Sequence, residues 1–272
     1  MDKKKIQQDY KSKIKLFKKY NDLYYDKNSP LISDSEYDDL KKEILFLENR
    51  YDFLRSKESP TTNVGYKPSK NFKKIAHRVP MLSLSNAFTE DDLLNFEKKI
   101  LNFLSKDNNF KISYSAEPKI DGISASLTYK NGKFERGLSR GDGREGEDIT
   151  SNLATIKDIP KKILDKDFPK DIDIRGEVFI QNSDFENLKE KFANPRNAAS
   201  GSLRQKNPED TKKIPLNFIA YTFGFEQGLN QKKQSDYLKK LYKWGFKTNP
   251  LNKTISGIKN LIQNYNEVEQ QR

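Results

Sequence analysis

Three charged side chains alternate within the hexapeptide Glu117-Pro-Lys119-Ile-Asp121-Gly122. In an extended chain every second side chain points the same way, so Glu117, Lys119 and Asp121 are predicted to share one face. A lysine amine held between carboxylates, with cations nearby to lower its pKa, can act as a nucleophile that forms a covalent intermediate. On a sheet that covers a core the same charges are ordinary solvated surface, so the hexapeptide alone leaves both interpretations open.

Arginine is scarce in this chain, which has 10 arginines against 41 lysines. Lysine therefore serves wherever a generic positive charge suffices, and the arginines are the more informative cations. A guanidinium offers a planar pair of donors to phosphate or carboxylate that lysine cannot replace. Several arginines lie in stretches rich in glycine, asparagine or proline, and these are candidate anion-binding residues: Arg140, Arg144, Arg175, Arg196 and Arg204.

The composition excludes several kinds of site. The chain has no cysteine, which rules out disulfides, thiolate nucleophiles and cysteine-ligated zinc within these residues. His77 is the single histidine and no nucleophile elbow accompanies it, so we assign it no catalytic role. The net charge of +12 fits a polyanionic partner and fits a solvated lysine-rich surface equally well.

Neither a membrane span nor a secretion signal is predicted. No uncharged apolar window approaches the length of about 18 residues that a bilayer requires. The N-terminal residues MDKKKIQQDYK are too polar for the core of a signal peptide. We therefore expect a cytoplasmic protein, with 17 Phe and 13 Tyr among the side chains available for a core.

Two amphipathic helices are predicted in the first part of the chain. Apolar or aromatic side chains recur every three or four residues across 3–25, which is the helical period. The same period returns over 37–51, and Ser33 or Asp34 can cap this second helix. The turn-forming segment 59–68 follows. The predicted division is a helical module over residues 1–64 and a larger domain over residues 65–272.

The larger domain is predicted to mix helices with antiparallel strands. Thr89 caps a helix whose apolar side chains are expected to form a buried face: Leu93, Leu94, Phe96, Ile100, Leu101 and Leu104. Alternating residues predict strands over 123–129 and 133–140, joined by a tight turn at Asn131-Gly132. The other expected elements are strands over 171–180 and 216–225 and helices over 182–191, 235–244 and 256–271. This is an α+β fold with antiparallel-rich sheets and flanking helices.

Three short motifs follow one another in the larger domain: Lys119-Ile-Asp-Gly122, Ser139-Arg-Gly-Asp-Gly143 and Ile174-Arg-Gly-Glu-Val-Phe179. Their order resembles that of the covalent nucleotidyltransferases, the family of DNA and RNA ligases and capping enzymes. Two further stretches, GEDITSN at 146–152 and FANPRNAASGSLRQ at 192–205, resemble the NAD-dependent bacterial DNA ligases specifically. Together the motifs span most of residues 111–225, a match too long for chance.

The helical module carries a second, independent resemblance. Tyr24-Tyr25 and the stretch Ile32-Ser-Asp-Ser-Glu-Tyr-Asp38 resemble the nicotinamide-mononucleotide-binding module of the NAD-dependent branch. Aromatic rings beside paired acids suit a cationic nicotinamide ring. The resemblance implies NAD contacts from Tyr24, Tyr25, Asp34, Ser35, Glu36, Tyr37 and Asp38. Locally, Asp34 also suits a helix cap and Tyr37 a core position, and one residue can serve both purposes.

In the larger domain, the resemblance implies a reaction in which Lys119 attacks the α-phosphate of NAD. Nicotinamide mononucleotide would leave, and the lysine would carry AMP. Asp121 would orient the lysine or a hydrated Mg²⁺, for which Mn²⁺ can substitute. Glu117 would bind the adenine, Glu177 the ribose, and Arg140 the ribose and phosphate. The remaining implied contacts are to the adenosine, from Ser83 and Leu84, and to DNA phosphates or the adenylate, from Arg196, Arg204 and Arg272.

The implied activity is that of an NAD-dependent DNA ligase used in DNA replication and repair. AMP would pass to the 5′-phosphate of nicked double-stranded DNA, and the 3′-hydroxyl would displace it to seal the strand. A monomer is expected. Two alternatives stay open: a non-catalytic NAD- or DNA-binding module derived from such a ligase, and a basic nucleic-acid-binding protein without nucleotide chemistry. The second explains the charge but not the order of the motifs.

The sequence departs from the family pattern in two places. Tyr25 stands where many members have histidine, which keeps stacking but loses a polar contact. An Asp-Gly-x-x-x-Lys strand and a later active-site lysine do not occur before Arg272, nor do an OB-fold, a zinc module or a helix-hairpin-helix clamp. We therefore expect an N-terminal part of a ligase, a fragment or a truncated relative, that binds nucleotide better than it reacts.

Overall fold

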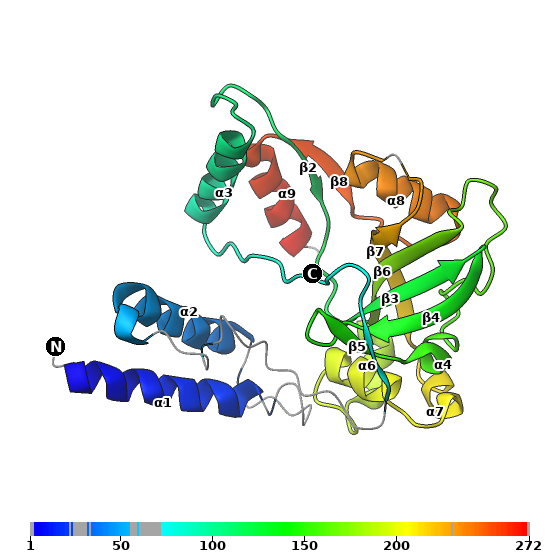
Figure 1. Ribbon diagram of the computed structural model, residues 1–272, viewed down its shortest axis with the longest axis horizontal. Coiled ribbons are helices and arrows are strands. Elements are labelled where there is room, and N and C mark those ends of the chain that lie inside the picture. Colours follow the sequence, from blue (N-terminus) through cyan, green and yellow to red (C-terminus); the bar gives the residue numbers. More distant parts are fainter. Residues whose placement is uncertain are drawn as a thin grey trace.

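The computed structural model describes most of the chain, namely residues 3–21, 23, 32, 34–54, 59, 72–229 and 231–270. Two helices lie side by side in the N-terminal part, next to a larger body of sheets and helices (Figure 1). The predicted fold class is confirmed, because every strand pairing in the described residues is antiparallel and helices flank the sheets.

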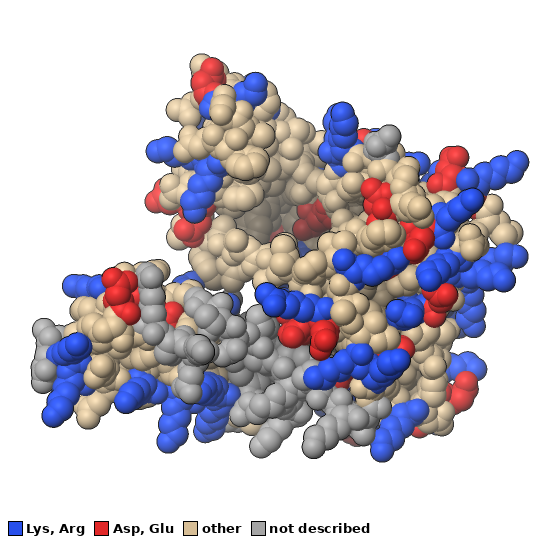
Figure 2. All heavy atoms as spheres, in the orientation of Figure 1, with Lys and Arg blue, Asp and Glu red and all other residues tan. Residues whose placement is uncertain are grey.

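The predicted helical pair is confirmed as α1 (Lys3–Asn21) and α2 (Asp34–Arg50), followed by the short 3-10 helix η2 (Asp52–Leu54). Their apolar faces form one core, made of Ile6, Tyr10, Ile14, Phe17, Ile44 and Leu54. Inside this core the buried Glu48 carboxylate accepts hydrogen bonds from the Tyr10 hydroxyl at 2.5 Å and the Ser59 hydroxyl at 2.8 Å. Lysine side chains line the outer edge of α1 (Figure 2).

The main sheet has the strand order β4-β3-β6-β7. The hairpin predicted at Asn131-Gly132 is confirmed, with positive φ values of 50° and 72° at its two turn residues. Every second residue of β6 points into the core, and its opposite face carries Asp171, Asp173, Arg175 and Glu177. The strands are β3 (Ile123–Lys130), β4 (Lys133–Ser139), β6 (Asp171–Phe179) and β7 (Asn217–Glu226).

The apolar face of the main sheet is covered by helices and loops. Tyr129 is fully buried there, in contact with the rings of Phe134, Phe168 and Phe246, and its hydroxyl donates to the Pro160 carbonyl at 2.6 Å. This core holds the sheet rigid from one side, which leaves the opposite, polar face free to present side chains. The helices of this domain around the sheet are α4 (Thr150–Leu153), α5 (Asn182–Phe185), the 3-10 helix η3 (Glu186–Leu188), α6 (Pro195–Leu203), α7 (Pro208–Lys212) and α8 (Gln234–Lys243).

Two smaller strand pairs lie at the edges of the larger domain (Figure 1). Strand β1 (Lys74–Ala76) pairs with β5 (Glu145–Glu147), and β2 (Ser113–Ala116) pairs with β8 (Lys253–Ser256). The second pair lies between α3 (Glu90–Phe103) and α9 (Ile258–Gln270) on one side and the main sheet on the other. Strands β1, β5 and β8 and helices α4, α6 and α7 were not predicted from the sequence.

The helix predicted from Thr89 is confirmed, with a capping box between Thr89 and Asp92. Its predicted buried face is confirmed only in part. Leu101 is buried and Leu93 and Ile100 are half-buried, but the other three side chains are each nearly half exposed, namely Leu94, Phe96 and Leu104. Among the described residues α3 packs mainly on α9, which covers one side of the helix only. The helix predicted over 182–191 is in fact α5 followed by the 3-10 turn η3.

Candidate active site

The loop that carries Lys119 runs from the end of β2 to the start of β3 and lies against β6. A methyl group on Gly122 would stand 2.2 Å from the carbonyl oxygen of Val178 and 3.0 Å from Cγ of Glu177. No side chain fits at such a distance, so glycine is what lets this loop approach β6. The motif glycine therefore brings Lys119 and Asp121 next to Glu177.

Glu177 lies at the centre of the cluster, on the polar face of β6. Ser124 is its register partner on β3, and the Ser124 hydroxyl donates to Glu177 Oε2 at 2.7 Å. Burial raises the pKa of Glu177, while the Ser124 hydrogen bond and the positive charges of Arg196 and Lys119 act in the opposite direction. The carboxylate is thus buried and yet faces two cations, an arrangement that suits hydrogen bonding to a bound hydroxyl group.

Arg196 reaches the cluster from the first turn of α6. This helix begins with Asn194, whose side chain accepts a hydrogen bond from the Asn197 amide, and with Pro195, whose fixed φ suits a first helical position. Arg196 Nη1 lies 3.2 Å from Asp121 Oδ1. The Asn-Pro-Arg sequence therefore places a guanidinium beside the Lys119 loop, as the scarcity of arginine suggested.

Arg140 approaches from the end of β4. Its backbone amide donates to the Ser124 carbonyl at 3.1 Å, which fixes the backbone of Arg140 beside β3. Its guanidinium donates to the Ser83 hydroxyl at 2.6 Å and to the Met81 carbonyl at 3.4 Å. The predicted link between Arg140 and the segment with Ser83 and Leu84 is thus a physical contact, and the Leu84 side chain beside it is exposed.

Glu117 is held by two residues. Glu117 Oε1 accepts hydrogen bonds from the Ser115 hydroxyl at 2.9 Å and from Gln234 Nε2 at 3.0 Å. Gln234, the first residue of α8, also donates to the Tyr221 carbonyl at 2.6 Å. The orientation of Glu117 is therefore set by Ser115 of the preceding strand β2 and by a helix 117 residues away in sequence.

Sequence reasoning missed three residues of this site: Ser124, Tyr221 and Gln234. Burial raises the pKa of the Tyr221 hydroxyl, and the neighbouring Glu177 raises it further, while Ser124, Arg175 and Arg140 lower it. The Tyr221 ring thus lies among the groups that surround Glu177. Tyr221 lies inside a predicted strand, where an aromatic residue is usually part of the core. The one hint of a role in the site was its hydroxyl group among apolar neighbours in the sequence.

The remaining predicted site residues lie apart from this cluster or outside the described residues. Arg204, at the end of α6, donates from Nε to Glu147 Oε2 at 3.0 Å, and that carboxylate is fully buried. Glu36 is exposed, and Tyr37 stacks on Phe17 at 4.9 Å in the helical core. Outside the described residues lie Tyr24, Tyr25 and Arg272, as well as the side chains of Asp34, Ser35 and Asp38.

Two further kinds of feature are absent from the described residues. No group of three or more His, Asp or Glu side chains converges there to hold a metal ion. No helix in this part of the chain is both long and apolar enough to cross a membrane. The arrangement combines an exposed amine, a buried carboxylate and two guanidinium groups, which suits the positioning and charge neutralisation of a phosphate group.

Two family models and several relatives match this sequence. A model of the NAD-dependent DNA ligase adenylation domain matches residues 69–272, and a model of the DNA ligase-like N-terminal NAD+-binding domain matches residues 3–65. A DNA ligase of Pelagibacter ubique is 63% identical over 272 residues, which is all of this chain and 40% of that protein. DNA ligases of Parvibaculum lavamentivorans and a Bradyrhizobium species are 45% and 44% identical over 93% and 92% of this chain, and 37% and 36% of those proteins.

The chain therefore spans about 40% or less of the length of these curated relatives. The adenylation-domain match alone covers well over half of the chain and includes Lys119, Glu177 and Arg196. The match to the N-terminal NAD+-binding domain covers the helical pair α1 and α2. On these matches, the chain belongs to the NAD-dependent DNA ligase adenylation domain family.

Proposed function

We propose that this chain performs the adenylation step of an NAD-dependent DNA ligase that seals nicks in double-stranded DNA during replication and repair. The observation that carries the proposal is the convergence of Lys119, Asp121, Glu177 and Arg196 from three separate segments of the chain. We further propose that the protein acts as a monomer in the cytoplasm, with nicked DNA and NAD as its substrates.

In the first step, the uncharged Lys119 amine attacks the α-phosphorus of NAD. A nitrogen–phosphorus bond forms, the phosphoanhydride bond breaks, and nicotinamide mononucleotide leaves with the bonding electrons. One of the two N–H protons of the amine passes to solvent, and the phosphoramidate nitrogen keeps the other. AMP then passes to the 5′-phosphate of a nick, which regenerates the lysine. Finally the 3′-hydroxyl attacks that phosphate and releases AMP. No net oxidation occurs.

The contacts of the site support a division of labour around the nucleotide. Glu177, held by Ser124, is proposed to accept hydrogen bonds from the ribose, and Glu117, held by Ser115 and Gln234, to bind the adenine. Arg140 would contact the ribose and phosphate beside Ser83 and Leu84, and Arg196 the α-phosphate or a DNA phosphate. Arg204 and Arg272 are proposed as further phosphate contacts. The nicotinamide half would be bound by Tyr24, Tyr25, Asp34, Ser35, Glu36, Tyr37 and Asp38.

A divalent cation is proposed to assist, although no protein cluster holds one in the described residues. Mg²⁺ keeps most of its water ligands and is commonly bound by one or two carboxylates together with substrate phosphates. Asp121, exposed at the edge of the cluster, is the carboxylate that would hold a hydrated Mg²⁺ or Mn²⁺. The cation would add to the neutralisation of phosphate charge that Arg196 begins.

The proposal is tested by the intact mass of the chain after incubation with NAD and Mg²⁺, compared with ATP and Mg²⁺. We expect an increase equal to one AMP with NAD and none with ATP. Measurable NAD binding without any adduct would favour the alternative, a nucleotide-binding module that does not react alone. If the chain neither bound NAD nor formed an adduct, the proposal would be contradicted.

A further inference from the structure

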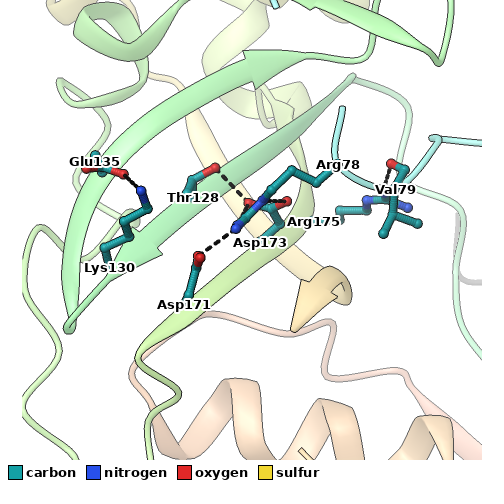
Figure 3. A network of polar contacts seen from close by, with 8 residues as sticks. All are labelled: Arg78, Val79, Thr128, Lys130, Glu135, Asp171, Asp173 and Arg175. Carbon is teal, nitrogen blue, oxygen red and sulfur yellow. Dashed lines mark hydrogen bonds and ion pairs between the residues drawn. The ribbon is translucent and has the colours of Figure 1, made fainter. Parts of the chain in front are cut away.

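A second network of charges lies on the polar face of the main sheet (Figure 3). Arg78, which follows β1, points between Asp171 and Asp173 of β6. Its Nε lies 2.9 Å from Asp173 Oδ2 and its Nη1 lies 2.7 Å from Asp171 Oδ1, while Nη2 forms a further short contact to Asp173. Asp173 also accepts from the Thr128 hydroxyl at 2.7 Å and is 7% exposed. This is a bidentate guanidinium–carboxylate pair, the strongest class of ion pair.

A second arginine binds the residues after Arg78 to strand β6. Arg175, two positions beyond Asp173 on β6, donates to the carbonyls of Val79 and Pro80. Its guanidinium lies over Gly224 of β7, where a methyl group would come within 2.9 Å of Arg175 Nε. The Arg78 guanidinium in turn lies 4.2 Å from the centre of the Phe225 ring.

The other end of this segment reaches the proposed nucleotide site. Met81 is buried, and its amide donates to the Gly143 carbonyl at 2.8 Å. The Met81 carbonyl and the Ser83 hydroxyl then accept the two hydrogen bonds of the Arg140 guanidinium. Residues 78–83 therefore connect β6 to Arg140. Arg78 and Arg175 bind one end of the segment to β6, and Met81 and Ser83 at the other end bind the Arg140 guanidinium.

The network does not itself resemble a ligand site. The pocket beside it, lined by residues that include Arg78, Thr128 and Asp173, has a volume of about 70 Å³. Pockets for ligands the size of a nucleotide usually have volumes of about 300 Å³ or more. The hydrogen-bonding groups of Arg78 already face carboxylates, so its contacts are internal to the protein.

We infer that Arg78, paired with Asp171 and Asp173, is a positioning residue that fixes Ser83 and the Arg140 guanidinium for nucleotide binding. The inference rests on the proposed function, since it concerns the same nucleotide. Asp173, Arg175 and Glu177 alternate on one face of β6, so the strand that holds the proposed ribose-binding carboxylate also holds the segment that orients Arg140. One rigid strand thereby sets the distance between two sides of the site.

The test compares NAD binding by Arg78→Met and by a matched control, Lys243→Met, in the 272-residue chain. Lys243, the last residue of α8, also pairs with two aspartates, Asp165 at 3.3 Å and Asp167 at 2.7 Å, which are not among residues 78–83 or their partners on β6. By calorimetry we expect Arg78→Met to weaken NAD binding about tenfold, which corresponds to about 1.4 kcal/mol. Lys243→Met should bind NAD as the unsubstituted chain does.

Arg78→Lys keeps the charge but lacks the planar pair of donors, so it should weaken NAD binding about threefold. This milder variant keeps the test valid if Arg78→Met does not fold. In an Arg140→Ala background, Arg78→Met should add less than a twofold loss, because its effect passes through Arg140. Unchanged binding by Arg78→Met, an equal loss in Lys243→Met, or a full additional loss in the Arg140→Ala background would overturn the inference. Absence of NAD binding by the unsubstituted chain would overturn the proposed function, and this inference with it.

Discussion

Glu177 is the residue on which the candidate site converges. It is 9% exposed and accepts a hydrogen bond from the Ser124 hydroxyl. The charges of Lys119, Arg196 and Asp121 act on its carboxylate. A buried carboxylate would ordinarily become protonated, and the hydroxyl and the two cations counter this tendency. The site therefore keeps a hydrogen-bond acceptor in a place that water barely reaches, which suits the ribose contact proposed for Glu177.

Ser124→Ala should make NAD binding more sensitive to acid. Removal of the hydroxyl removes a group that lowers the pKa of Glu177, so the pKa rises and the carboxylate is protonated at higher pH than before. NAD affinity, measured by calorimetry over a pH series, should begin to fall at a higher pH than in the unsubstituted chain. Ser126→Ala, on the same strand and face, is the control and should leave the pH profile unchanged. Identical profiles for Ser124→Ala and the unsubstituted chain would remove Glu177 from nucleotide binding.

At the scale of elements, the Lys119 loop is placed by its contact with β6. Gly122→Ala should displace this loop, because the new methyl group would lie 2.2 Å from the Val178 carbonyl oxygen. We expect AMP-adduct formation, followed by intact mass, to fall at least tenfold. Gly201→Ala in α6 meets only the edge of the Phe192 ring at 3.3 Å and serves as the control. Normal adduct formation by Gly122→Ala would show that the loop does not need this approach.

His77 joins the segment after β1 to the end of β4, since its Nε2–H donates to the Arg140 carbonyl at 3.0 Å. Burial lowers the pKa of His77 below its ordinary value of 6.5, with the Arg175 charge acting in the same direction. Between the lowered pKa and 6.5 the unfolded chain binds more protons at this site than the folded one. Stability contributed here is therefore complete above pH 6.5 and is lost as the pH falls through that window.

The unfolding midpoint is expected to drop by a few degrees between pH 7.5 and pH 5.5, and the drop should be smaller in His77→Gln. Thermal unfolding of both proteins at several pH values checks this, and the difference between them isolates the imidazole from acidic groups that titrate in the same range. If both midpoints moved by the same amount, His77 would have no part in the pH dependence.

Local sequence patterns predicted most of the helices, strands and turns, but they did not predict contacts between residues far apart in the sequence. The turn at Asn131-Gly132 and the cap at Thr89 depend on neighbouring residues, so each was recognisable from its own segment. Gln234 reaches Glu117 across 117 residues, and nothing in either segment indicates that contact. The apolar side of α3 shows the converse, because Leu94 and Phe96 follow the helical period and yet are each nearly half exposed. A periodic pattern shows which side chains share one face of a helix. Whether that face is buried depends on which other elements of the fold pack against it.

The site residues divide in the same way. Lys119, Glu177 and Arg196 were identified because their motifs are contiguous in sequence. Arg78 was not identified, although arginine is rare in this chain, because its partners lie on β6 about 95 residues later. The boundary between the two domains at residues 64 and 65 falls outside the described residues and stays a prediction.

At the scale of the whole molecule, the helical module and the larger domain are proposed to bind opposite halves of NAD. Asp38→Ala should then weaken NAD binding at least tenfold while AMP binding, which needs no nicotinamide contact, stays unchanged. Calorimetry with both nucleotides measures the two affinities. Asp39→Ala, one position further along α2 and paired with Lys42, is the control. Equal losses for NAD and AMP would contradict a role for Asp38 confined to the nicotinamide half.

Lys119, one of 41 lysines, is proposed to be the nucleophile of this chain. Peptide mapping by mass spectrometry after incubation with NAD and Mg²⁺ tests it most directly. We expect AMP on Lys119 and on no other lysine, and no adduct on Lys119→Arg, which should still bind NAD. An adduct on a different lysine, or one that persists in Lys119→Arg, would contradict the assignment of Lys119 and with it the proposed adenylation site.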